Sequence, residues 1–297
     1  MKVVLVPIDF STFSLAALQT ARRITAKNQG RIICISVIPS EIDWDLLPDE
    51  AKAKYPELVR QQQETLKILP GYTKSVTPVK SDFGQIVKIG VPYEQILRTA
   101  DQMKVDLIVI GAHGKGYTEG NFVGSTLQKV MRFAPCPVLS VKEPLDGNAF
   151  RKFAFATVFN PAGKAAFQKI LPLARIFKSS IHLLFVNTPA HFTTSAESDQ
   201  DMAEFGKGHE QFVIHRHVFN DHDAEGGIRG FCEKNNIRLV GIATGERLHS
   251  PAYQIGTTDT LIFKSELGVL SVNARLPESK PLFIDSVSED PVVPDVR

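Results

Sequence analysis

The chain repeats itself, and an internal repeat constrains the fold of a sequence more than any other feature. Lys2–Ser11 reads KVVLVPIDFS, and Lys152–Pro161 reads KFAFATVFNP. Both are short apolar runs that end in a turn, which is typical of a strand buried on both faces. A helix is expected after each run, with Ser11 or Ser14 as the first N-cap and Asn160 as the second. Each half of the chain therefore begins with a strand and a helix of its own.

The later elements repeat in the same order. Second strands are expected at Arg31–Pro39 and Ser180–Pro189, and a helix followed by a buried strand at Tyr93–Ile110 and Glu225–Ile242. The same four letters, VLSV, close both copies. The sequence predicts one departure from the repeat, a short hairpin within residues 75–90 of the first copy.

Strands that alternate with helices of about 10–15 residues predict right-handed crossovers and a mostly parallel sheet. The fold class is therefore α/β, with two tandem doubly wound domains of five strands each. We place the first domain at residues 1–144 and the second at residues 150–275, joined by a short linker with Pro, Asp and Gly. Residues 276–297 are acidic and contain four prolines, which predicts an extended tail.

The composition excludes several kinds of partner. The 34 basic and 32 acidic residues leave a formal net charge of +2, too little to hold nucleic acid or an anionic membrane surface. No apolar run approaches the roughly 20 residues that span a bilayer, and the start of the chain lacks a signal-peptide pattern. The three cysteines are widely spaced and form no CxxC pair, so neither a disulfide framework nor a four-cysteine zinc site is expected. We therefore expect a cytoplasmic protein that binds neither nucleic acid nor membranes.

The loop after the fourth strand of the first copy carries the clearest binding motif. It runs from Gly111 to Thr126 with the spacing G-x2-G-x9-G-S, directly after the apolar run Leu107–Ile110. Glycine lets a backbone approach a phosphate closely, and Gly124 and Ser125 open a predicted helix whose free N–H groups attract anions. The loop therefore indicates a phosphate site at the carboxyl ends of the strands, where open α/β sheets bind ligands. A glycine-rich turn that only packs is the alternative interpretation.

Two common nucleotide motifs are missing from the sequence. No GxxxxGK[ST] occurs, which excludes a P-loop, and no GxGxxG follows the first strand, which argues against a nicotinamide or flavin dinucleotide domain.

Taken in order, the segments PIDFS, SVIP, GVPYEQIL, DLIVIGAHGKG…GST and CPVLSV resemble the universal stress protein family. The resemblance spans nearly all of residues 1–142. Residues 150–273 are similar to a second, diverged copy, so the whole chain resembles a tandem universal stress protein. The resemblance implies a Rossmann-like fold with strand order 3-2-1-4-5 in each half and, in one subclass of the family, a site for ATP or AMP.

The resemblance also assigns the residues of that site. It places the first-strand end near the ribose, the backbone of the second-strand end near adenine, and the glycine loop around the phosphates, with or without Mg²⁺. The expected binding residues are Pro7, Asp9, Val37, Ile110, Gly111, Gly114, Gly124, Ser125 and Thr126. For Asp9 the alternative is a carboxylate that only caps the following turn. Glu119 departs from the family pattern, because it places negative charge where basic residues are common.

The second copy has lost these groups. Aligned by sequence, Phe159 replaces Asp9 and Ile242 replaces Gly111, while Gly256 and Thr257 still offer a helix N-terminus to an anion. A phenylalanine cannot accept hydrogen bonds from ribose, so we expect one competent site and one degenerate site per chain.

Other candidate chemistry is weaker. His215 and His217 alternate on the expected third strand of the second copy, and with His222 nearby they are candidate zinc ligands, although a solvated strand edge is the favoured interpretation. Cys136 is interpreted as a buried apolar residue without a redox role. No nucleophile elbow or carboxylate cluster occurs, so at most slow ATP hydrolysis or autophosphorylation, with Ser125 as a candidate acceptor, is expected.

Three functional hypotheses follow. The first is a regulatory stress-response module that binds an adenine nucleotide in its first half and acts on a protein partner. The second is a nucleotide-free scaffold whose halves pair through their VLSV strands as an intramolecular pseudo-dimer, with a further homodimer also open. The third is an adenine-nucleotide hydrolase, which the absence of an SGGxDS-type loop after the first strand disfavours.

Overall fold

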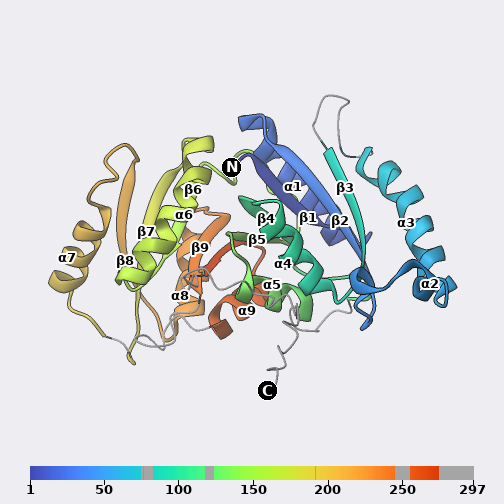
Figure 1. The fold of residues 1–297 in the computed structure, drawn as a ribbon. Helices are drawn as coiled ribbons and strands as arrows, with labels where there is room; N and C mark the ends of the chain where they lie inside the picture. Colours follow the sequence, from blue (N-terminus) through green and yellow to red (C-terminus); the bar gives the residue numbers. More distant parts are fainter. Residues whose placement is uncertain (75, 77–82, 118–123, 191, 245–254, 274–297) are drawn as a thin grey trace, which may run out of the picture.

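The computed structural model describes all residues except 75, 77–82, 118–123, 191, 245–254 and 274–297. Strands and helices alternate along the chain (Figure 1). The strands are β1 (Val3–Pro7), β2 (Arg31–Pro39), β3 (Phe83–Gly90), β4 (Leu107–Gly111), β5 (Val138–Val141), β6 (Lys152–Ala156), β7 (Ser180–Asn187), β8 (Ile214–Asn220), β9 (Leu239–Thr244) and β10 (Gly268–Asn273). The helices are α1 (Thr12–Asn28), α2 (Asp49–Lys52), α3 (Pro56–Lys74), α4 (Pro92–Gln102), α5 (Ser125–Phe133), α6 (Pro161–Phe177), α7 (Ser195–Gly206), α8 (Ala224–Lys234) and α9 (Ile255–Lys264), with a 3₁₀ turn, η1 (Trp44–Leu46).

All ten strands form one sheet in the order β3-β2-β1-β4-β5-β10-β9-β6-β7-β8. Within each half the neighbours are parallel and the order is 3-2-1-4-5, which confirms the predicted fold class. The halves meet where β5 and β10 pair antiparallel, with Leu139 opposite Leu270. The two VLSV segments therefore join the halves into one sheet.

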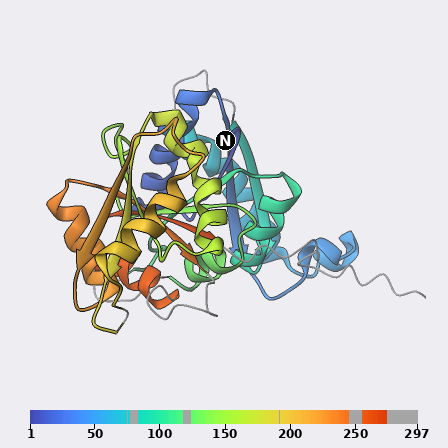
Figure 2. The same ribbon diagram turned by 90° about the vertical axis from the view of Figure 1, so that its left-hand side faces the viewer.

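Helices cover both faces of this sheet (Figures 1 and 2). One apolar core lies under α1, α3, α6 and α7, and the other under α4, α5, α8 and α9. The strand centres are buried on both sides, since Val4, Leu5 and Val6 of β1 are all fully inaccessible. This two-sided burial explains why the strands appear in the sequence as continuous apolar runs.

Local signals set the predicted helix starts. The Ser11 side chain accepts a hydrogen bond from the N–H of Ser14 at the start of α1, and Asn160 accepts one from Gly163 at the start of α6. Both helices end at a residue in the left-handed conformation, Gln29 and Lys178. The two halves thus use the same devices at the same places.

Two expectations from the sequence are wrong in detail. Residues 83–90 form β3, an edge strand parallel to β2, and not one arm of a hairpin; residues 77–82 lie outside the described part of the chain. The alignment of the two copies is also displaced by one residue. Since β1 matches β6 and Phe10 and Phe159 both have positive φ, the counterpart of Asp9 is Val158, not Phe159.

The same displacement affects the fourth strand. In the pairing of β1 with β4 and of β6 with β9, Gly111 matches Ala243 and not Ile242. The error arises because both runs are apolar throughout, so the sequence offers no polar residue to fix the register.

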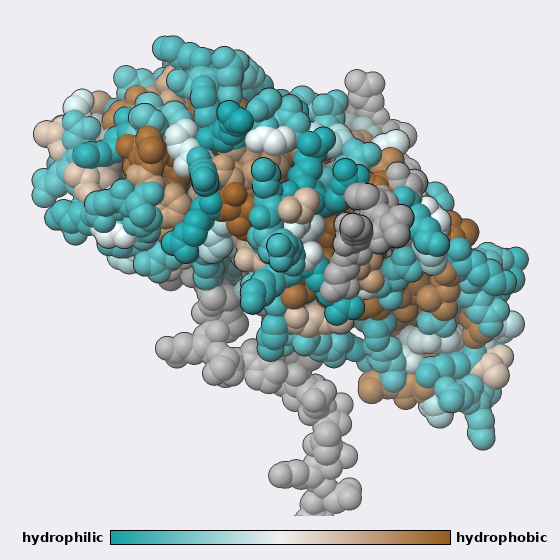
Figure 3. All heavy atoms as spheres, turned by 90° about the horizontal axis from the view of Figure 1, so that it is seen from above, coloured by the Kyte–Doolittle hydropathy of each residue, from teal (hydrophilic) through white to brown (hydrophobic). Residues whose placement is uncertain are grey.

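The surface carries polar side chains over most of the face seen from above (Figure 3). Among the described residues, no helix is both long enough and apolar enough to cross a membrane.

Candidate functional site

The nine residues expected to bind a nucleotide line one cavity. It lies at the carboxyl ends of β1, β2 and β4 and beside the N-terminus of α5, and its volume is about 750 Å³. That volume falls within the range of about 300–1,000 Å³ that is usual for small-molecule sites. The topology therefore gathers Pro7, Val37, Gly114 and Thr126, which are far apart in the sequence, around a single space.

Asp9 connects the end of β1 to the glycine loop. Its Oδ1 accepts hydrogen bonds from the N–H and hydroxyl of Ser11, at 3.0 and 2.6 Å. Its Oδ2 accepts one from the backbone N–H of Lys115 at 2.6 Å. The carboxylate is thus a structural link within the chain, and of its roughly four lone-pair sites only one, on Oδ2, is left for a ligand.

The glycines of the loop serve different purposes. A Cβ on Gly111 would lie 2.7 Å from the Cβ of Phe13, so the packing of α1 requires glycine there. A Cβ on Gly114 would lie 3.3 Å from Oδ2 of Asp9, and Gly116 has a φ of +95°, which favours glycine. No atom of the described residues lies within 4 Å of a Cβ built on Gly124, and its φ of −60° suits any residue. Of the loop glycines that the structure describes, Gly124 is therefore the one that packing and backbone conformation do not explain.

The N-terminus of α5 faces this cavity. Gly124 is the N-cap, and among the described residues no side chain caps the helix, so its first-turn N–H groups can bind an anion. Ser125 and Thr126 follow and add hydroxyl groups to the lining. This arrangement suits a phosphate.

One wall of the cavity was not predicted from the sequence. It is formed by four residues of α3, Gln61, Glu64, Thr65 and Ile68. Their i, i+3, i+4, i+7 spacing is the signal that indicates a shared helix face. The charged residues in the lining are Asp9, Glu64 and Lys115.

The second half lacks these polar groups at the end of β6. Val158 replaces Asp9, and the ring of Phe159 packs against Phe205 with 5.1 Å between centroids. The expected anion site at Gly256 falls inside the first turn of α9, and residues 245–254, which precede it, lie outside the described part. The structure thus shows an apolar strand end where the first half has a carboxylate.

The candidate zinc ligands are arranged differently from the expectation. His215 and His217 lie beside His182 of β7, whose Nδ1 is 3.0 Å from Nε2 of His217. His182 was missed because it lies in an apolar run. Burial and the neighbouring His217, His215 and Lys152 lower the pKa of His182 to about 4. His222 lies beyond the end of β8, and no group of three metal ligands occurs in the described residues.

Cys34 and Cys232 are buried, whereas Cys136, which was expected to be buried, is only partly so and packs against the second core. Burial raises the pKa of each thiol, in Cys34, Cys136 and Cys232, to about 12. Such thiols carry little of the reactive thiolate at neutral pH.

Comparison with known proteins gives the family. The model of the universal stress protein family matches residues 1–142. Two universal stress proteins of Methanocaldococcus jannaschii are 32% and 28% identical over 158 and 159 residues, which cover 48% of this chain and 83% and 94% of theirs. A universal stress protein of Archaeoglobus fulgidus has the same overall fold, with a TM-score of 0.70 and 16% identity over 92% of this chain and 99% of its own. With its motifs, the strand order 3-2-1-4-5 in each half of its sheet and these relatives, the chain belongs to the universal stress protein family.

Proposed function

We propose that the first half binds one adenine nucleotide, ATP or AMP, and that the bound nucleotide regulates contacts with a protein partner. The observation that carries this proposal is the convergence of all nine expected residues on one cavity. The family resemblance supplies the ligand class, and the uncapped N-terminus of α5 supplies a place for phosphate.

The lining suggests a role for each wall. The α5 N–H groups with Ser125 and Thr126 would donate to phosphate oxygens, and the remaining lone pair on Oδ2 of Asp9 would accept from a ribose hydroxyl. The apolar side chains of Val37, Ile96 and Ile68 would contact the base. Mg²⁺ would enter with ATP, because the described lining offers two carboxylates and no three-ligand group.

Turnover of the nucleotide is expected to be slow. The carboxylates among the described lining residues are Asp9, which already accepts three hydrogen bonds, and Glu64 on α3. A general base must be within hydrogen-bond reach of the attacking water, and Asp9 is held by Ser11 and Lys115 instead. We therefore favour a binding module over a hydrolase, with Ser125 as the candidate acceptor for autophosphorylation.

A nucleotide-free scaffold is the second candidate. Its support is that Asp9 and Gly111 each have a purpose within the protein, one as a link to the loop and the other in packing against Phe13. In this alternative the loop is a relic and the paired β5 and β10 carry the function.

Two measurements decide between these candidates. Mass spectrometry of material released from freshly purified protein should detect an adenine nucleotide. Calorimetry with ATP and AMP should give one site per chain, because Val158, the counterpart of Asp9, has no side-chain acceptor for a ribose hydroxyl. Two equal sites would contradict the assignment to the first half, and no binding would favour the scaffold.

A further inference from the structure

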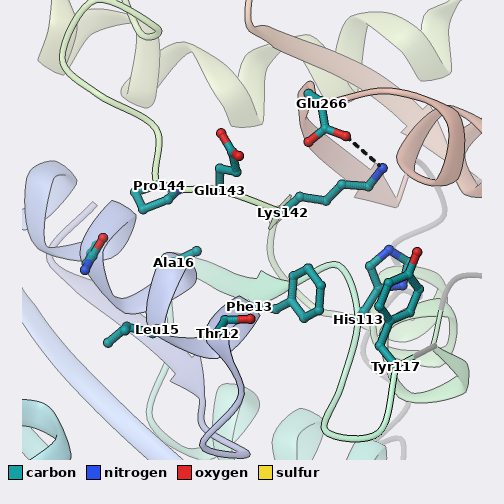
Figure 4. A pocket seen from close by; sticks show the side chains of 11 residues that line it. Thr12, Phe13, Leu15, Ala16, His113, Tyr117, Lys142, Glu143, Pro144 and Glu266 are labelled. Carbon is teal, nitrogen blue, oxygen red and sulfur yellow. Dashed lines mark hydrogen bonds and ion pairs between the residues drawn. The ribbon is translucent and has the colours of Figure 1, made fainter. Parts of the chain in front are cut away.

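A second cavity lies at the junction of the two halves, beside the first (Figure 4). Its volume is about 480 Å³. It is lined by one face of α1, by His113 and Tyr117 of the glycine loop, by residues 142–144 after β5, and by Glu266, which precedes β10 in the second half. Cavities between domains are common places for small ligands.

Three rings form one wall of this junction cavity. The rings of Phe13 and His113 meet edge to face with 5.1 Å between centroids, and those of Phe13 and Tyr117 do so at 5.5 Å. His113 and Tyr117 are stacked at 3.8 Å. The lack of a Cβ on Gly111 is what allows Phe13 to approach the end of β4 this closely. Aromatic faces attract cations.

The opposite wall is charged. Figure 4 shows Lys142, Glu143 and Glu266 across the open space from the rings. Lys142 donates to the carbonyl of Phe263 at 2.9 Å and lies 3.4 Å from a carboxylate oxygen of Glu266. Because that pair neutralises itself and no ion pair of Glu143 occurs among the described residues, the lining has one negative charge in excess.

His113 adds a second, independent observation. Its side chain is only 6% exposed, and its buried Nδ1 has no hydrogen-bond partner. Burial and the nearby Lys142 lower the pKa of His113, so the imidazole is neutral at pH 7 and has a free acceptor or donor. Buried polar atoms without partners are unusual, and a polar group of a ligand bound beside His113 would supply the missing partner.

We propose that the junction cavity binds a small organic cation with an apolar body, such as an aromatic amidinium or guanidinium. The rings of Phe13 and Tyr117 contact the apolar body and the cationic face, and the carboxylate of Glu143 pairs with the charge. This site is distinct from the nucleotide cavity, although His113 and Tyr117 line both. The proposal does not depend on nucleotide binding.

Three compounds of the same shape and different charge test the ligand class. Benzamidinium, benzamide and benzoate share a ring and differ in charge, and calorimetry on the full chain should rank their affinities in that order. The methyl NMR signals of Leu15, which lines the junction cavity, should shift with benzamidinium, and those of Ile96 in the nucleotide cavity should not. Benzoate binding as tightly as benzamidinium, or shifts at Ile96 alone, would overturn the proposal.

Two variants test the assigned residues. Glu143→Gln should weaken benzamidinium about fivefold, as expected for a partly exposed ion pair. Glu50→Gln on α2 should change nothing and serves as the matched control. Tyr117→Leu should weaken the binding of benzamidinium about threefold to tenfold, because the aromatic ring is lost. Both Glu143 and Tyr117 lie at the surface, so folding is preserved, and unchanged affinity in both variants would reject the site.

Discussion

The two halves have the same strand order and the same helix caps, yet they differ at the carboxyl ends of their strands. The first half has Asp9 at the end of β1 and Gly111 at the end of β4, where the second has Val158 and Ala243. The cores beneath are equally buried in both halves. The second half thus maintains the same fold without these residues, so the strand order and the cores do not by themselves require them; in the first half Gly111 packs against Phe13 and Asp9 holds the glycine loop.

The first prediction compares two glycines near a helix start, Gly124 in the cavity lining and the exposed Gly256. Gly124→Val should reduce ATP affinity at least about 100-fold, because the new side chain enters ligand space and its Cβ meets no atom of the described residues. Gly256→Val at the start of α9, where a Cβ also meets nothing, should leave ATP affinity unchanged. Calorimetry measures both.

Folding controls complete this comparison. Each variant should change the free energy of unfolding by less than about 1 kcal/mol, as is usual for surface substitutions. If Gly124→Val binds ATP like the parent, the loop is only a turn and the scaffold interpretation is correct.

The second prediction concerns packing. Gly111→Ala should lower the free energy of unfolding by about 2 kcal/mol, because its Cβ would overlap the Cβ and backbone of Phe13. The reverse change in the second half, Ala243→Gly, should cost about 1 kcal/mol through lost burial and a more flexible unfolded chain. Urea unfolding measures both values. If Gly111→Ala and Ala243→Gly changed the free energy of unfolding equally, α1 would pack no closer to β4 than α6 packs to β9.

The third prediction concerns pH and the strand pair β7–β8. His182 matches Ile33 of the first half, and its folded-state pKa of about 4 lies below the ordinary value of 6.5. The unfolded chain therefore binds more protons between pH 6.5 and 4, and stability falls as the pH falls through that window. The parent protein should therefore lose about 1–2 kcal/mol of unfolding free energy between neutral pH and pH 4.5 through His182, after allowance for its partial exposure. His182→Ile should abolish this loss.

Asp259 also titrates in this pH range, so its contribution must be separated from that of His182. Burial raises its folded-state pKa to about 6, above the ordinary 3.8, so its contribution has the opposite sign: stability rises as the pH falls from 6 towards 3.8. Comparing His182→Ile with its parent in an Asp259→Asn background isolates the imidazole. A pH profile that is identical with and without His182 would contradict the assigned shift.

The smallest expected effect is at Asp9. Asp9→Asn replaces one carboxylate oxygen by an NH₂ group, which then faces either the N–H of Lys115 or the donors of Ser11. Because two donors cannot hydrogen-bond to each other, the substitution should lower the free energy of unfolding by about 1 kcal/mol. ATP and adenosine should both bind about fivefold more weakly, since the change acts near the ribose. Val158→Ala in the second half should affect neither ligand. If only the affinity for ATP fell and that for adenosine did not, Asp9 would have to be assigned to the phosphates and not to the ribose.

Much of this fold was accessible from the sequence because its signals are local. Apolar runs mark β1 and β6, Ser11 and Asn160 mark the helix starts, and the position of Gly124 predicts the beginning of α5. The sequence also predicted that the nine site residues lie together, because parallel strands bring their carboxyl ends to one edge of the sheet.

What the sequence could not supply depends on pairing across the sheet. The alignment of β6 with β1 was wrong by one residue because Lys2 was matched with Lys152, whereas the strand starts match Val3 with Lys152. In the apolar run of β9 no polar residue fixes the register. His182 was missed because only the pairing of β7 with β8 places it beside His215. The reason for Gly111 was also hidden, since the approach of Phe13 is a tertiary contact.

The antiparallel pairing of β5 with β10 has a consequence for regulation. Two separate copies of one half would meet at a rate set by their concentration, and dilution would part them. Here the short linker at residues 143–149 keeps β10 permanently near β5, at an effective concentration in the millimolar range that is usual for short linkers. The joined state is therefore insensitive to how much protein a cell makes. Covalent linkage also lets mutations accumulate in one half without being copied into the other, an asymmetry that a symmetric pair of identical chains cannot acquire.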